Sequence, residues 1–152
     1  MELLIVVAVI AMLTMIAYPN FVRTKYESRR TDAQGAVIAV DSMVRRYLTE
    51  TNQPNFTSGD FSLSQFANYS SSSSTPVYSP QGYYILTIIP DSSGFTVTAT
   101  ATVRNSTATC FANPTSQQCA DNLCQEISLY HGTKQSTDSS GDVYNASTTQ
   151  CW

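Results

Sequence analysis

The chain has 152 residues, enough for one domain with a buried core. Ser and Thr supply 39 residues, charged residues make up 12%, and the formal net charge is −3. From residue 51 onward two basic residues stand against six acidic ones, so this part lacks the basic stripe that nucleic-acid binding needs. A local patch around Arg104 and Lys134 is the alternative. The low charge is common in chains that face the outside of the cell.

The first predicted element is a long helix that begins with an apolar segment, residues 1–22. Glu2 heads about sixteen almost unbroken apolar residues, close to the roughly 20 that span a membrane. A carboxylate beside such a run costs roughly 3 kcal/mol in lipid, so Glu2 needs an explanation. A helix N-terminal acid favoured by the macrodipole is one alternative. A secretory signal peptide fits poorly, because an acid leads the segment and helix follows it.

The same helix is predicted to continue as an amphipathic half, residues 23–50, giving about fifty residues in all. Pro19 removes a backbone donor and is expected to kink or loosen the turn before it. An apolar stripe recurs at helical spacing, with Arg29 and most other charged residues placed off it. The stripe consists of Ala33, Val37, Val40, Val44, Tyr47 and Leu48.

Beyond the helix, the composition predicts a loop and then strands. Residues 51–80 are rich in Ser, Asn, Pro and Gly and are expected to form an irregular connecting loop. In residues 81–152, strands are predicted at 82–90, 95–103 and 125–131, and the second alternates strictly between apolar residues and Thr. His131, beside Gly132, is predicted to lie in a turn. The remainder up to Cys151 is turn-rich and is expected to need a disulfide for order.

Four cysteines lie in the last third of the chain: Cys110, Cys119, Cys124 and Cys151. An even count in an exported chain predicts two disulfides. Of the three connectivities, the chain order favours Cys110 with Cys119 and Cys124 with Cys151. A zinc site is the competing interpretation, but the cysteines lack close paired spacing and His131 is not spaced as a partner.

Motifs for catalysis are absent from the sequence. It contains no G-x-S-x-G, P-loop, paired His ligands or Gly-rich dinucleotide turn, so we predict neither an enzyme nor a cofactor. Asp138 and Asp142 flank a glycine and are candidate calcium ligands, although their spacing is not that of an EF-hand and a surface turn is the alternative. Candidate glycosylation sites begin the N-x-S/T sequons at Asn55, Asn68, Asn105 and Asn145.

The segment ELLIVVAVIAMLTMIAYPNF, residues 2–21, resembles the start of a processed type IV pilin: an acid, about sixteen apolar residues and then Pro. The cysteines at 124 and 151 and the ending Gln150-Cys151-Trp152 resemble the type IVa branch. The resemblance implies an α+β pilin fold, with the long helix packed against a C-terminal antiparallel sheet and a disulfide-closed C-terminal region. Cys110 and Cys119 are an extra pair. The family's first three residues, beginning with a methylated Phe, would precede Met1, which is either native or an added start.

The resemblance also implies a function. The chain would be a subunit of an extracellular type IV pilus of a Gram-negative bacterium, serving adhesion, twitching motility or DNA uptake. Glu2 would pair with the N-terminal amine of a neighbouring identical subunit, and Pro19 would mark a helix turn that unwinds in the filament. Other partners would be the prepilin peptidase, the inner-membrane assembly machinery and, before assembly, the inner membrane itself. Alternatives are a minor pilin, a type II secretion pseudopilin or a DNA-binding pilin for natural transformation.

Overall fold

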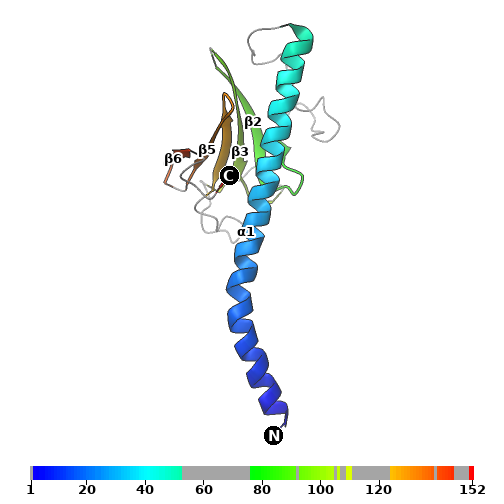
Figure 1. The fold of residues 1–152 in the computed structure, drawn as a ribbon, viewed down its shortest axis with the longest axis vertical. Coiled ribbons are helices and arrows are strands. Elements are labelled where there is room, and N and C mark those ends of the chain that lie inside the picture. The colour runs from blue at the N-terminus through cyan, green and yellow to red at the C-terminus, as the bar shows by residue number, and fades with distance from the viewer. Residues whose placement is uncertain are drawn as a thin grey trace.

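The computed structural model combines one long helix with one antiparallel sheet (Figure 1). It describes residues 2–52, 76–91, 93–104, 106, 109–110, 124–138, 140–145 and 151–152. Helix α1 covers Glu2–Thr51 and has 50 residues, which corresponds to about 75 Å at 1.5 Å per residue. The α+β prediction and the predicted helix of about fifty residues are confirmed.

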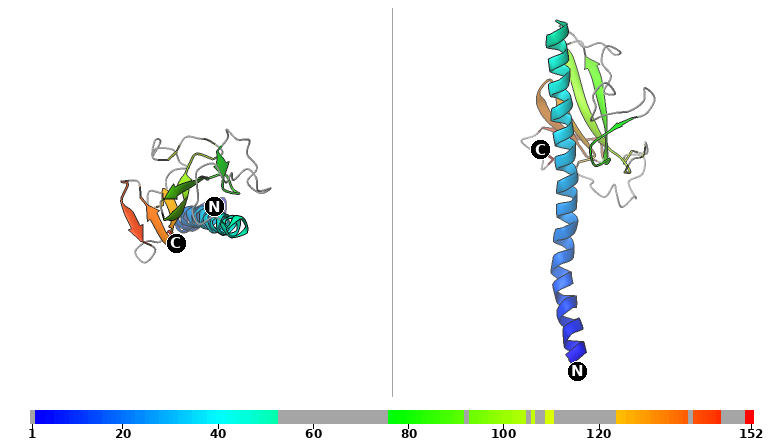
Figure 2. Two further views of the ribbon diagram at one scale, coloured as in Figure 1. Left: turned by 90° about the horizontal axis from the view of Figure 1, so that it is seen from above. Right: turned by 90° about the vertical axis from the view of Figure 1, so that its right-hand side faces the viewer.

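Helix α1 has two halves with different surroundings. Its first half extends alone, while its second half lies along the sheet (Figures 1 and 2). We call this second half together with the sheet the head. The helix passes through Pro19 without interruption, although Pro19 has no N–H to donate to the carbonyl four residues before it. The expected loosening at Pro19 therefore does not amount to a break in α1.

The strands follow one another in the sheet in the order in which they occur in the chain, and every neighbouring pair is antiparallel. The predicted strands at 82–90, 95–103 and 125–131 are confirmed as β2, β3 and β4. Strands β1, β5 and β6 were not predicted, and β1 begins within the expected loop 51–80. The bounds are β1 Val77–Tyr78, β2 Tyr84–Asp91, β3 Gly94–Ala101, β4 Glu126–Tyr130, β5 Thr133–Thr137 and β6 Val143–Asn145.

A two-residue turn joins β4 to β5. Tyr130 pairs with Thr133, and the residues between them, His131 and Gly132, have φ angles of 48° and 88°. Two successive positive φ angles form the hairpin turn whose twist matches that of the strands. The prediction that His131 lies in a turn is confirmed.

The core lies between the second half of α1 and the strands β2, β3 and β4. Four residues of the predicted stripe are fully buried in α1: Ala33, Val37, Val40 and Val44. They belong to one cluster with Leu86, Val97, Ala99 and Ile127 of the sheet, and Tyr47 and Leu48 pack against it half-buried. The helical stripe is confirmed as the face that holds α1 to the sheet.

Arg29 corrects one expectation about this stripe. It was predicted to lie off the buried face, yet only 8% of it is exposed. Arg29 precedes Ala33 by four residues, and residues four apart lie on the same side of a helix. Its guanidinium carbon lies 4.2 Å from the centre of the Tyr83 ring, so the charge is buried as a cation–π contact.

The C-terminus is fastened to both α1 and the sheet. The predicted disulfide Cys124–Cys151 is confirmed, with a sequence separation of 27. Cys110 is disulfide-bonded, and Cys119 lies outside the described residues. The Gln34 side-chain amide donates to the carbonyl of Cys151 at 2.6 Å, and the indole N–H of Trp152 donates to the carbonyl of Gln135 at 2.7 Å.

Candidate assembly surface

The apolar side chains of the first segment of α1 are exposed to solvent. Its large apolar side chains are between 50% and 82% exposed, and none of its most apolar stretch is buried. They are Leu3, Leu4, Ile5, Val6, Val7, Val9, Ile10, Met12, Leu13, Met15, Ile16, Tyr18 and Phe21. Because they surround the helix on all sides, the segment is not one face awaiting a single partner.

An exposed apolar surface of this size is unfavourable in water and needs to be buried against lipid or protein. Covering one such side chain fully gains roughly 2 kcal/mol, so covering the exposed parts of all of them gains on the order of 15 kcal/mol. That figure is comparable to the whole stability of a typical domain, about 5–15 kcal/mol. Exposed patches of this kind mark membrane or protein–protein contacts. By length and composition, with a mean hydropathy of 2.2 over 18 residues, α1 is apolar enough to cross a membrane.

The polar side chains within the segment bond to their own helix. The Thr14 hydroxyl donates to the carbonyl of Ala11 at 2.9 Å. Six residues further along the helix, the Asn20 amide donates to the carbonyl of Ile16 at 3.4 Å. Side-chain groups satisfied in this way do not need water, which suits an apolar surround.

Glu2 is the first residue of α1, and its side chain is exposed. An acid in the first turn is favoured by the helix dipole. This contribution is at most about 1 kcal/mol at an exposed site, which is less than the roughly 3 kcal/mol that a carboxylate costs in lipid. A cationic partner is the chemistry that would offset the difference. The structure confirms that Glu2 lies at the N-terminal end of the segment. The cationic partner of Glu2 stays a prediction.

The apolar segment ends where ion pairs begin. Arg23 and Glu27 form the first pair, with a distance of 2.9 Å from Nε to Oε1. Two similar i,i+4 pairs follow along the helix, Arg45 with Asp41 at 2.8 Å and Arg46 with Glu50 at 2.7 Å. These pairs are exposed to solvent, which screens them, so each adds little to the stability of the helix. They indicate that the face of the second half of α1 opposite the core lies in water or at a polar boundary.

Known protein families, curated proteins and solved structures give no match to this chain. The candidate function therefore rests on the geometry and on the sequence pattern of the segment.

The candidate calcium ligands occupy a turn between β5 and β6. Asp138 Oδ1 accepts the amide N–H groups of Ser140 at 2.8 Å and Asp142 at 3.1 Å, and its Oδ2 accepts the hydroxyl of Tyr144 at 3.2 Å. Desolvation alone would raise the pKa of Asp138, but these hydrogen bonds outweigh it and lower the pKa. Among the described residues no group of three His, Cys, Asp or Glu gathers. Asp138 thus builds a turn, and calcium binding there stays a prediction.

The candidate glycosylation sites are mostly beyond what the structure describes. Asn145 is the third residue of β6 and is exposed. Asn55, Asn68 and Asn105 lie outside the described residues.

Proposed function

We propose that this chain is the structural subunit of an extracellular type IV pilus and that it polymerises through the apolar segment of α1. Before assembly the segment lies in the inner membrane of a Gram-negative bacterium, where the prepilin peptidase and the assembly machinery act on the chain. After assembly the head faces the outside of a cell-surface filament. The observation that supports this best is an exposed apolar helix half that continues, without a break, into a half that packs against the sheet.

The energetics of polymerisation follow from this surface. Moving the apolar segment from lipid into a bundle of identical segments exchanges one apolar environment for another, so the hydrophobic terms nearly cancel. Close packing of helices and the charge on Glu2 then decide the balance. An ammonium at the N-terminus of a neighbouring subunit, about 4 Å from the Glu2 carboxylate, contributes about 4 kcal/mol at an effective dielectric constant of 20. Such a pair also sets the axial offset between subunits.

The tied C-terminus supports a role as a filament surface. The Cys124–Cys151 disulfide and the Gln34 contact hold the last residues against α1. A long disulfide-closed C-terminal region is less expected of a type II secretion pseudopilin, which is the alternative from the same class of helix. Pro19 supports local unwinding on assembly, because the turn before it already lacks one backbone hydrogen bond.

The test is a charge-neutral substitution, Glu2→Gln, with Glu50→Gln as the matched control at the other end of α1. We expect wild type and Glu50→Gln to give filaments that can be sheared from cells and seen by electron microscopy. Glu2→Gln should leave the chain in the membrane fraction with few or no filaments. The main band of the sheared filaments, identified by mass spectrometry, should be this chain. Abundant filaments from Glu2→Gln, or a main band from a different protein, would refute the proposal.

A further inference from the structure

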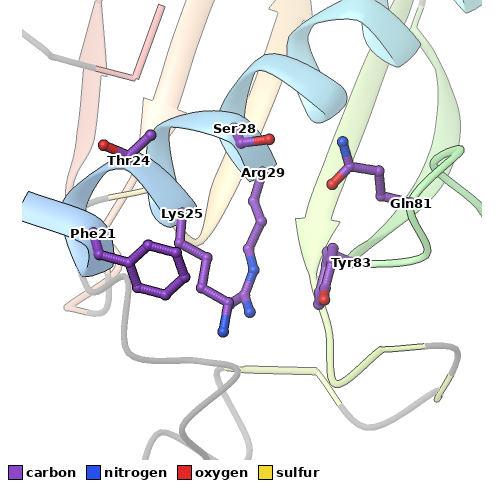
Figure 3. A pocket seen from close by; sticks show the side chains of 7 residues that line it. All are labelled: Phe21, Thr24, Lys25, Ser28, Arg29, Gln81 and Tyr83. Atoms are coloured by element: carbon purple, nitrogen blue, oxygen red, sulfur yellow. The ribbon is translucent and has the colours of Figure 1, made fainter. Parts of the chain in front are cut away.

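A small cavity of about 230 Å³ lies where the apolar segment meets the head (Figure 3). Lys25 and Arg29 of α1 line it, facing Gln81 and Tyr83, which precede β2. Its volume is below the range of about 300–1,000 Å³ that holds drug-sized molecules. The cavity therefore suits a small chemical group, and its charge indicates which one.

Positive charge converges on this cavity. The guanidinium carbon of Arg29 lies 4.2 Å from the centre of the Tyr83 ring, and that of Arg104 lies 5.7 Å from the same ring. Lys25 is one turn before Arg29, so two like charges share one side of α1. Lys25 and Arg29 of α1 therefore supply the charge of the cavity lining, whereas Arg104, from the segment after β3, contacts Tyr83 without lining the cavity.

Neighbouring acids do not neutralise Lys25. Glu27 pairs with Arg23 at 2.9 Å, and Asp32 Oδ2 accepts the backbone N–H of Gln81 at 3.3 Å. No ion pair of Lys25 occurs within the part of the chain that the structure describes. An anion in the cavity would therefore give the Lys25 ammonium a partner of opposite charge. Arg29 is held in place for such contacts because it is buried against Tyr83.

The position along α1 matches the edge of a lipid bilayer. Residues 2–21 span about 30 Å at 1.5 Å per residue, which equals the hydrocarbon thickness. Lys25 then lies about 6 Å and Arg29 about 12 Å beyond that boundary. Helical side chains lean toward the N-terminus, and Figure 3 shows Lys25 and Arg29 leaving α1 in the same direction. The long Lys25 side chain can thus reach the layer of headgroups, as basic side chains do at membrane surfaces, while Arg29 stays against Tyr83 at the inner side of the cavity.

We propose that this cavity binds the phosphate headgroup of one anionic phospholipid while the chain is in the membrane. The inference rests on the proposed function for the membrane position of the apolar segment. Arg29 and Lys25 would donate to phosphate oxygens, and the Ser28 hydroxyl and the Gln81 amide are available to a polar headgroup such as glycerol. Phe21, which is 66% exposed and also lines the cavity, would contact the start of an acyl chain.

The test compares lipid selectivity of the full chain in nanodiscs of phosphatidylcholine with a fifth of phosphatidylglycerol. Native mass spectrometry of the released chain measures the ratio of retained phosphatidylglycerol to phosphatidylcholine. We expect one retained phosphatidylglycerol per wild-type chain and about a ten-fold lower ratio for Lys25→Gln. Arg23→Gln is the control, because it removes the same charge at nearly the same depth but outside the cavity. It should stay within two-fold of wild type.

Each other outcome would overturn the inference. Equal loss in Arg23→Gln and Lys25→Gln would indicate diffuse attraction to the membrane surface, and equal retention in wild type and Lys25→Gln would remove the site. Binding of soluble glycerol phosphate to the detergent-solubilised chain at micromolar concentration would indicate a free phosphate rather than a lipid. If the chain does not enter nanodiscs at all, the proposed function fails together with the inference. If it enters without selecting phosphatidylglycerol, only the inference fails.

Discussion

Opening the Cys124–Cys151 disulfide should cost the head a large part of its stability. The bond closes a loop with a sequence separation of 27. On the chain-entropy estimate, a loop of this length restricts the unfolded chain by about 3.5 kcal/mol at 25 °C. The bond also positions the carbonyl of Cys151 for the Gln34 amide, a contact that contributes about 1 kcal/mol. The variant Cys124→Ala/Cys151→Ala should therefore lose about 3.5–4.5 kcal/mol of unfolding free energy.

Trp152 provides the assay, because it is the single tryptophan and stands next to Cys151. Its indole N–H donates to the carbonyl of Gln135, and the Lys134 ammonium lies 4.8 Å from its ring. Its fluorescence during urea unfolding of the detergent-solubilised chain reports release of the C-terminus. With a slope of about 2 kcal/mol per molar urea, the midpoint should fall by roughly 2 M.

The single variants supply an internal control for this reasoning. Cys124→Ala and Cys151→Ala each open the same loop, so each alone should lose nearly as much as the double variant. A midpoint shift below about 0.5 M for the double variant would refute the assignment of stability to loop closure. Losses that add from the single variants to the double variant would show that side-chain packing, not the covalent link, carries the effect.

Two further predictions concern the sheet. Burial raises the pKa of Glu126 above its ordinary value of 4.5, so the folded state favours the neutral acid, and this stability is lost as pH rises through the raised pKa. Glu126→Gln should therefore raise the urea midpoint at pH 7 but not at pH 3.5; a gain at both values would contradict the titration. Gly132 has φ of 88°, and a Cβ there would meet Arg45 only at 3.8 Å, so Gly132→Ala should cost about 1–2 kcal/mol through backbone strain. Gly35 lies in α1, and a Cβ there meets nothing within 4 Å. Gly35→Ala should therefore stabilise the protein by up to about 1 kcal/mol in the same assay. Equal effects of the two Gly→Ala substitutions would refute the argument from backbone strain.

The helix and the central strands were predictable because their sequence patterns match their burial. The stripe from Ala33 to Val44 repeats at the helical period, and in β3 the alternating Phe95, Val97 and Ala99 are buried. Thr98 departs from this pattern, because it is buried as well. Strand β5 has the sequence TKQST, which carries no apolar alternation. It forms because the turn at His131 and Gly132 folds it back onto β4, so its register is set by its neighbour rather than by its own composition.

The same distinction separates the two candidate sites: one has a continuous pattern in the sequence, and the other is formed only by the fold. The assembly surface was predictable, because Glu2 and the apolar run are continuous in sequence and need no partner in the head to be recognised. The cavity was not, because Arg29, Gln81 and Tyr83 meet only after α1 packs against the sheet. The spacing of four between Arg29 and Ala33 could have placed Arg29 on the buried face, but no local pattern supplies the aromatic ring that it contacts.

The two outermost strands limit how copies of the chain can join. Strand β1 has two residues and β6 has three, so these two strands themselves offer few unpaired backbone groups, although β1 pairs with only Ile85 and Leu86 along β2. Short edge strands are a common protection against sideways sheet growth and amyloid-like stacking. In the proposed filament the heads would lie close together, and short outermost strands would then give each head little backbone through which to join a neighbouring sheet.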